Sequence, residues 1–371
     1  MTTTPKRILV LGGYGNFGSY ICRSLAAEDD IQLIIAGRSG DTCKTFAQSL
    51  TDAKHKPEYK IIDARHDLYQ ALLNLKPHVV IHTCGPFQGQ DYTIAKSCIK
   101  YGCHYLDLAD GRNFVSGINV LHGDAKEKNV SIISGASSVP CLSSAIIDHY
   151  LPQFEKLQNI DYGIATAQQT NRGLATTSSV LSYTGQGFKT LINGDMKTVY
   201  GWQNLHRHRY PEFGKRFLGN CDIPDLELFP QYYPNLKTIR FYAGVEMSFM
   251  HLGLWMLSFL PRWKIIKSLA PFAPKLIKAS NLFDGFGSGN SALHMQMSGI
   301  GKDRKPLQKT FHLTAKDGHG PYIPCMPAIV LAKQLIRGTF QKAGAFPCVS
   351  LITLETYLDA LKHLNIQSYD D

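Results

Sequence analysis

Three glycines near the start of the chain, Gly13, Gly15 and Gly18, have G-x-G-x-x-G spacing within the stretch RILVLGGYGNFGSYICRSL. At this spacing the first glycine is expected to permit a tight turn, the second a close approach to phosphate, and the third close packing of helix on strand. The apolar run 8–11 predicts a buried strand before the turn. Apolar residues at helical spacing from Phe17 predict a helix after it, and helix N-termini attract anions. The alternative is a glycine-rich turn without a ligand. The residues expected to contact a dinucleotide here are Gly13, Tyr14, Gly15, Asn16, Phe17 and Gly18.

The end of the next predicted strand, residues 31–38, indicates which dinucleotide binds. Dinucleotide sites for NAD place a carboxylate about 20 residues beyond the glycines, where it binds the ribose 2′-hydroxyl. This chain has Arg38 and Ser39 there instead. A guanidinium and a hydroxyl suit a 2′-phosphate, so NADP(H) is favoured over NAD. Two alternatives stay open: Arg38 is a surface residue, or nearby Asp41 takes the carboxylate role.

Polar and small residues occur at the carboxyl ends of the following predicted strands. Parallel sheets bind their ligands at this edge. Those expected near the cofactor are Asp63, Cys84, Gly85 and Pro86. The candidates for a proton donor are Tyr14, Cys84, Tyr105, Asp107, Cys141 and His319, of which we retain Cys84, Asp107, Cys141 and His319 as catalytic candidates. Cys84 and Cys141 would lie near each other if both are at the carboxyl-end edge of the sheet. The glycines on either side of His319 are expected to leave its imidazole exposed. The alternatives are buried apolar thiols and an ordinary turn histidine.

A polar stretch, residues 168–179, offers a second group of ligand-binding side chains. Asn171 and Arg172 are candidates for substrate contact, because a guanidinium can bind an anionic group. Thr177 or Ser178 is expected to cap a following helix. The alternative is a polar loop with a capped helix and no ligand.

Six apolar strands alternate with helical patterns over the first ~140 residues, which predicts a Rossmann-type, doubly wound parallel sheet. The strands are expected at 8–11, 31–38, 59–64, 78–85, 104–109 and 130–136. Strict alternation then stops, and an α+β domain is expected, followed by helical patterns at the C-terminus. The predicted division is a dinucleotide-binding domain (1–148), an α+β substrate and dimerisation domain (149–324), and C-terminal helices that pack on the first domain (325–371).

Composition narrows the class of protein. The 371 residues carry a net charge of +10, but the basic residues are dispersed without a recognition motif, so nucleic acid is not an expected partner. The nine cysteines lack C-x-x-C or metal-site spacing, which favours free thiols, a cytoplasmic location and no metal. The polar start MTTTPKR does not resemble a signal peptide.

Residues 245–278 interleave aromatic and aliphatic side chains with cations. The apolar part is too short to span a bilayer. Two interpretations remain: core or dimer-interface helices whose lysines reach solvent, or a peripheral surface that contacts a membrane.

Several motifs in order resemble the saccharopine dehydrogenase-like oxidoreductases nearly end to end. They are LGGYGNFG, AGRS, IHTCGPFQGQDYTIAKSCIKYGCHYLDLAD, IISGASSVPCLSSAIID, CDIPDLELFP and KDGHGPYIPCMPAIVLAKQL. The resemblance implies a Rossmann domain, an inserted α+β domain, C-terminal helices that return to the first domain, and often a homodimer.

One departure separates the chain from true saccharopine-forming reductases. The resemblance implies an aspartate-proline-glycine turn after the sixth strand, where this chain has Val139, Pro140 and Cys141. Other proteins that resemble this pattern include enoyl reductases acting on lipid-like chains. The expected function is an NADP(H)-dependent oxidoreductase acting on an amino-acid-derived or lipid-like small molecule. The alternative is a dinucleotide-binding sensor or scaffold without turnover.

Overall fold

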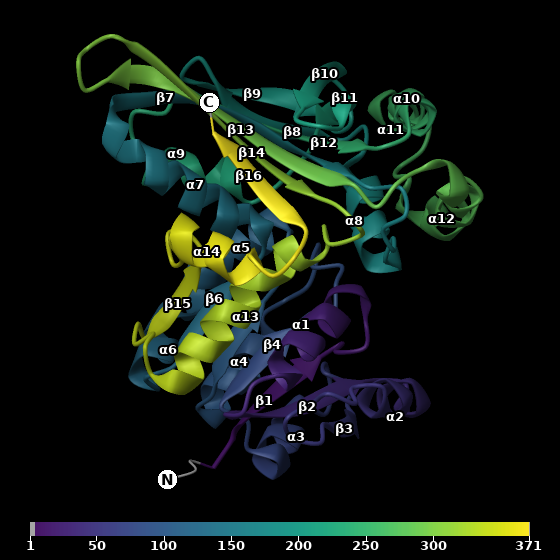
Figure 1. Cartoon of the computed structure of the whole chain (residues 1–371), viewed down its shortest axis with the longest axis vertical. Coiled ribbons are helices and arrows are strands. Elements are labelled where there is room, and N and C mark those ends of the chain that lie inside the picture. Colours follow the sequence, from purple (N-terminus) through teal and green to yellow (C-terminus); the bar gives the residue numbers. More distant parts are fainter. Residues whose placement is uncertain (1–3, 371) are drawn as a thin grey trace. The chain divides into compact units, whose positions relative to one another are not determined.

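The computed structural model describes residues 4–370, which form two compact units (Figure 1). The first unit contains residues 4–142 and 322–352, and the second contains residues 143–321 and 353–370. The chain therefore passes from one unit to the other three times.

The first unit is built from seven strands and the helices that connect them. Its strands are β1 (Lys6–Leu11), β2 (Ile31–Gly37), β3 (Glu58–Ile61), β4 (Val79–His82), β5 (His104–Asp107), β6 (Ser131–Ser134) and β15 (Gly344–Pro347). Its α-helices are α1 (Asn16–Ala26), α2 (Gly40–Gln48), α3 (Leu68–Leu75), α4 (Thr93–Tyr101), α5 (Arg112–Ser116), α6 (His122–Glu127) and α13 (Tyr322–Arg337).

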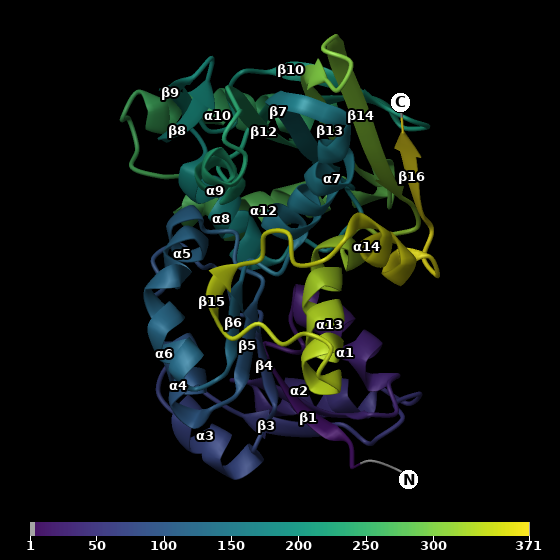
Figure 2. The same ribbon diagram turned by 90° about the vertical axis from the view of Figure 1, so that its left-hand side faces the viewer.

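These strands form one parallel sheet in the order β15-β6-β5-β4-β1-β2-β3. Helices α3, α4 and α6 cover one face, and α1 and α13 lie on the opposite face (Figure 2). Because both faces are covered, the central strands are continuous apolar runs, and residues 8–11 of β1 are all buried. The carboxyl ends of β1, β2 and β4 lie side by side at one edge, which is where the predicted cofactor residues occur.

The second unit is a mixed sheet with its own helices. Its strands are β7 (Phe154–Thr166), β8 (Gly187–Ile192), β9 (Asp195–Tyr200), β10 (His206–Tyr210), β11 (Gly214–Asn220), β12 (Thr238–Val245), β13 (Ser291–Gly301), β14 (Pro306–Ala315) and β16 (Ile366–Asp370). Its α-helices are α7 (Ser143–Tyr150), α8 (Leu174–Tyr183), α9 (Asp225–Tyr232), α10 (Ser248–Leu257), α11 (Phe259–Arg262), α12 (Ala273–Asn281) and α14 (Leu354–Leu361).

Seven of these strands pair in the order β10-β11-β12-β7-β13-β14-β16, and β8 and β9 form a separate hairpin. Only the β7–β12 pair is parallel. Asp225 of α9 joins two further elements, since it accepts hydrogen bonds from the Ser143 hydroxyl of α7 and the Tyr162 hydroxyl of β7. Buried hydroxyl–carboxylate bonds of this kind fix how helices lie on a sheet.

The structure confirms the predicted α/β class, with a doubly wound parallel sheet and an α+β second part. It differs at the C-terminus. Residues 325–371 were expected to pack on the first domain, and α13 does so, but β16 pairs with β14 and α14 contacts α7 in the second unit. Among the described residues, no helix is long and apolar enough to cross a membrane.

Candidate functional site

The glycine-rich turn joins β1 to α1 and includes Gly12, Gly13 and Tyr14. Gly12, not Gly13, has a left-handed backbone with φ of +77°. A Cβ on Gly12 would lie 2.7 Å from Thr83 Oγ1 and 2.8 Å from Cys84 Sγ, so this turn presses against the end of β4. Gly13 allows close packing instead, because a Cβ there would lie 3.0 Å from Cys22 Sγ. Gly13 lies inside this turn, which the Gly15 N to Gly12 O hydrogen bond closes at 2.8 Å, and Gly12 adds a positive φ that the sequence analysis did not predict.

Gly18 has the packing role expected of it, and the approach of phosphate to Gly15 stays a prediction. Gly15 is the N-cap of α1, and a Cβ there would meet only Gly12 O, at 3.0 Å. A Cβ on Gly18 would lie 2.2 Å from Gly12 O, so only glycine lets α1 approach the turn this closely. No side chain caps α1, and its first turn holds no carboxylate.

This turn fits a pyrophosphate. The backbone N–H groups of Asn16, Phe17 and Gly18 lie in the first turn of α1, where no helical carbonyl is available to them. Open donors and the positive end of the helix dipole favour an anion at this position.

Arg38 and Tyr14 lie beside the end of β2. Arg38 is exposed, and its guanidinium makes no hydrogen bond or ion pair within the described chain. Its charge nevertheless favours the ionised forms of Asp63 and Cys84. The Tyr14 ring covers Gly37, where a Cβ would lie 2.3 Å from the ring, and its hydroxyl accepts a hydrogen bond from Ser39 N. The Ser39 hydroxyl caps α2 through Thr42, whereas the Arg38 guanidinium has no partner among the described residues.

Cys84 lies between the turn and the end of β4. Burial raises the pKa of its thiol to about 11, so the thiol stays protonated at neutral pH. Gln90 holds this loop by donating to the carbonyl oxygens of Cys84 (2.9 Å) and Pro86 (2.7 Å). Asp63, at the end of β3, accepts from Arg65 N (3.0 Å) and contacts His66, and these hydrogen bonds lower its pKa.

Asp107 is fully buried at the end of β5. One of its oxygens accepts from Ala109 N (2.9 Å), Gly135 N (2.8 Å) and Ser134 Oγ (3.0 Å), which ties β5 to the end of β6. Burial raises its pKa to about 6, although these hydrogen bonds oppose the rise. Asp107 thus holds the carboxyl ends of β5 and β6 together.

Cys141 does not pair with Cys84. Strand β5 separates β4 from β6 in the sheet, and Cys141 is fully buried where it contacts Cys348, just after β15. Burial, together with a hydrogen bond between its thiol and Cys141, raises the pKa of Cys348 well above its usual range. The sequence signal that was missed is β15 itself, which adds a seventh strand beside β6.

The other predicted site residues belong to the second unit. His319 is half-buried rather than exposed, because its Nδ1 accepts from Asn365 N at 2.8 Å. Arg172 donates to Asn281 and forms an ion pair with Asp284, so its charge is already neutralised. Asn171 is exposed. The expected caps were wrong: α8 begins after Gly173, which places Thr177 and Ser178 inside the helix.

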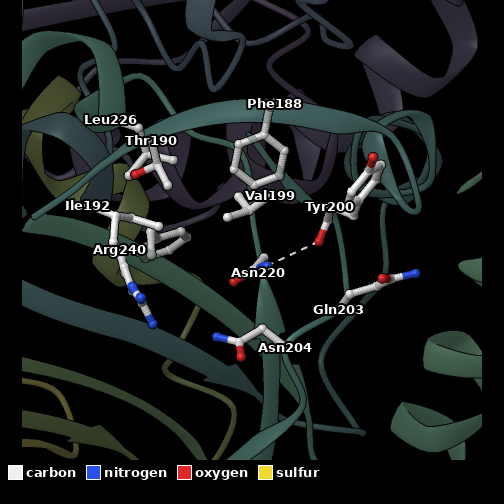
Figure 3. Close-up of a pocket in the computed structure, with 11 residues that line it drawn as sticks. Phe188, Thr190, Ile192, Val199, Tyr200, Gln203, Asn204, Asn220, Leu226 and Arg240 are labelled. Atoms are coloured by element: carbon white, nitrogen blue, oxygen red, sulfur yellow. Dashed lines mark hydrogen bonds between the residues drawn. The ribbon is translucent and has the colours of Figure 1, made fainter. Parts of the chain in front are cut away.

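A cavity of about 260 Å³ lies in the second unit between the β8–β9 hairpin and β12 (Figure 3). Its lining combines apolar side chains with the polar ones of Thr190, Tyr200, Gln203, Asn204, Asn220 and Arg240. Asn220 donates to Tyr200 O, and the Arg240 Nε atom is buried without a hydrogen-bond partner in the described chain. None of the residues predicted from the sequence lines this cavity. An isolated arginine within an apolar strand was the only signal that could have indicated it.

Comparison with known proteins identifies the first domain. Residues 8–133 match the family model described as the saccharopine dehydrogenase NADP binding domain. A candidate trans-acting enoyl reductase of Mycobacterium tuberculosis is 26% identical over 146 residues, which is 38% of this chain and 35% of that protein. The match thus spans about a third of that relative's length.

The complete chain has a known fold. Apo saccharopine dehydrogenase (L-Glu forming) from Saccharomyces cerevisiae superposes with a TM-score of 0.71, covering 99% of this chain and 100% of that one at 14% identity. At this identity the likeness concerns the fold. The N-terminal part of the chain thus matches a nicotinamide dinucleotide-binding domain model, and the chain shares the fold of saccharopine dehydrogenase.

Proposed function

We propose that the protein is an NADP(H)-dependent oxidoreductase that acts on an amino-acid-derived or lipid-like small molecule. The observation that carries the proposal is the open β1–α1 turn together with the unpaired Arg38 at the neighbouring end of β2. In this arrangement the first-turn N–H groups of α1 bind the pyrophosphate, and the guanidinium binds the 2′-phosphate. The relative named as an enoyl reductase supports the redox class.

When bound, the dinucleotide supplies or accepts a hydride, and reduction of an unsaturated substrate bond then needs one proton as well. The chain's own part is to position the reactants, exclude water and provide that proton. Of the four retained catalytic candidates, Cys84 is the one that lies against Gly12 of the glycine turn, and its pKa of about 11 keeps the thiol neutral. It therefore suits a hydrogen-bond or proton donor and does not suit a thiolate nucleophile.

Replacement of Arg38 tests the cofactor assignment. Arg38→Asp is expected to weaken NADPH binding at least about tenfold and NADH binding much less, because it removes a charge-assisted bond and adds a repelling carboxylate. Dissociation constants from the fluorescence of the reduced nicotinamide measure both. Lys44→Asp, at an exposed position of α2, makes the same change in net charge and should leave the ratio unchanged. Equal losses for both cofactors would reject NADP(H) specificity.

A binding protein without turnover is the second candidate. It is favoured by one observation: Asp107, Cys141 and His319 each contact a structural partner. Single-turnover oxidation of NADPH, with enoyl thioesters and with 2-oxo acids plus amines as substrates, separates the candidates. Oxidation that depends on one substrate supports the enzyme. Tight NADPH binding with no oxidation across both substrate classes supports the binding protein.

A further inference from the structure

Exposed apolar side chains are concentrated in residues 247–286 of the second unit, here called the helical flank. The flank contains α10, α11, α12 and two short 3₁₀ turns (Ala270–Phe272 and Asp284–Phe286). Eight of its large apolar side chains are exposed: Phe249, Met256, Trp263, Ile265, Phe272, Leu282, Phe283 and Phe286. Trp263 is 66% exposed and Phe286 is 78% exposed. Concentrations of this kind on a protein surface mark interaction sites.

These side chains do not belong to the core that anchors the flank. That core is formed by Leu181, Leu269 and Ala273, with Leu254 and Leu276 packed against it. Two of the exposed aromatic residues contact each other instead, since the Phe249 and Phe283 rings are 4.9 Å apart, and exposed Trp263 packs on half-buried Phe259 with the rings 5.1 Å apart. Helices α10, α11 and α12 group at one end of the second sheet (Figure 1). The flank therefore has an anchored inner side and an apolar outer side.

The charge of the flank is almost entirely positive. Its cations are all exposed: Arg262, Lys264, Lys267, Lys275 and Lys278. Its one carboxylate, Asp284, is neutralised by Arg172. The ammonium groups of the four lysines make no ion pair or hydrogen bond within residues 4–370. Cations are thus available beside the exposed aromatic groups, and Trp263 stands directly between Arg262 and Lys264.

We propose that the helical flank docks on the surface of bilayers that contain anionic phospholipids. Amphipathic surfaces bind such bilayers by burying aromatic and aliphatic groups at the boundary between headgroups and acyl chains, while lysine and arginine attract the anionic headgroups. Trp263 has the environment that interfacial tryptophans favour, with an apolar ring held at headgroup level between two cations. The protein lies on the membrane in this docking, with its flank helices in the plane of the interface.

A second copy of the chain is a poorer occupant for the same surface. A symmetric dimer through the flank would bring two sets of five cations together, with only the neutralised Asp284 on each side to offset them. Like charges across an interface oppose association. The excess of positive charge is complementary to an anionic lipid surface.

Vesicle flotation with the wild-type chain tests the proposal without any variant. We expect the protein to float with 1:1 POPC/POPG vesicles in 50 mM NaCl and to remain unbound with pure POPC. Binding to POPG vesicles should fall at least tenfold in 500 mM NaCl, because salt shortens the range of the charge attraction. No flotation with POPG at low salt would overturn the proposal, and so would equal binding to POPC.

Variants locate the contact. Lys264→Glu/Lys267→Glu should reduce binding at least tenfold, whereas Lys126→Glu/Lys128→Glu, exposed positions in the first unit, change the net charge equally and should leave most binding intact. Trp263→Ser should also weaken binding and abolish a blue shift of tryptophan emission on mixing with vesicles. Circular dichroism confirms that each variant is folded. Equal losses in both lysine pairs would reject the flank as the contact.

Light scattering after size exclusion distinguishes a lipid surface from a contact between copies. If the chain forms dimers that Trp263→Ser separates, the flank is a protein interface and the proposal fails. The inference is independent of the redox proposal, because flotation is measured without dinucleotide. Loss of NADPH binding in Arg38→Asp should leave flotation unchanged.

Discussion

His82 ends β4 as a buried imidazole whose hydrogen bonds define its tautomer. Its Nδ1 accepts from Cys84 N (3.4 Å), and its Nε2 contacts the Gln90 side-chain oxygen (3.3 Å), to which an N–H must donate. Burial lowers the pKa of this histidine to about 4. The neutral ring therefore helps to position the loop that carries Cys84.

The lowered pKa of His82 predicts acid sensitivity. An unfolded histidine has a pKa of ~6.5, so the unfolded chain binds the proton more readily than the folded chain. The stability that the neutral ring contributes is present above pH 6.5 and is lost as the pH falls toward 4. Between pH 7.5 and pH 5 the loss amounts to about 2 kcal/mol. His82→Gln should remove this part of the pH dependence, measured by urea unfolding followed by circular dichroism.

His363→Gln is the matched control for His82→Gln, because it removes one exposed histidine. The variants are compared by the difference in unfolding free energy between the two pH values, which separates titration from other effects of the substitution. The same pH dependence in His82→Gln and wild type would contradict the assignment.

At the scale of elements, two glycines at the N-terminal turn of α1 have different roles: Gly18 contributes to stability and Gly15 to NADPH binding. A Cβ at position 18 would lie 2.2 Å from Gly12 O, so Gly18→Ala should destabilise the protein by about 3 kcal/mol through overpacking. Gly15 faces open space apart from one 3.0 Å contact. Gly15→Val should therefore abolish NADPH binding and leave the melting temperature of the apo protein nearly unchanged.

Gly123→Ala provides the control for added side-chain volume. A Cβ at this position of α6 meets nothing within 4 Å, and alanine favours helix over glycine by ~1 kcal/mol, so a slight stabilisation is expected. Thermal unfolding and NADPH titration of the three variants measure both effects. A stable Gly18→Ala, or micromolar NADPH binding by Gly15→Val, would contradict the roles assigned to the turn.

The local sequence pattern predicted most strands and helices of the first unit. Features that depend on pairing between residues far apart in the sequence were missed. The six predicted strands are present, and the central ones were readily predicted because buried parallel strands are apolar runs that a sequence displays directly. Strand β15 was missed because its four residues, GAFP, include glycine and proline and pair only with distant β6. The ion pair of Arg172, a candidate for substrate contact, was likewise missed because its partner, Asp284, lies 112 residues away.

At the scale of the whole molecule, the chain returns to the second unit after residue 352, so α14 and β16 belong to that unit. The sequence analysis did not predict this return. The polar strand β16, IQSYD, has no core pattern, and its membership follows from pairing with β14. All three tryptophans of the chain, Trp202, Trp255 and Trp263, lie in the second unit. Their fluorescence therefore reports on the unfolding of that unit.

Two matched truncations of buried leucines test this assignment. Leu361 of α14 is 1% exposed and Leu335 of α13 is 5% exposed, so replacement of either by alanine should cost about 3 kcal/mol. Leu361→Ala should lower the urea midpoint seen by tryptophan fluorescence and increase amide exchange in β14 and β16. Leu335→Ala should increase exchange in β1 and α1, which share the first unit with α13, and should shift the fluorescence midpoint less. If Leu361→Ala instead increased exchange in β6 and β15 and left β14 unchanged, the C-terminal segment would belong with the dinucleotide-binding sheet, as the sequence alone had predicted.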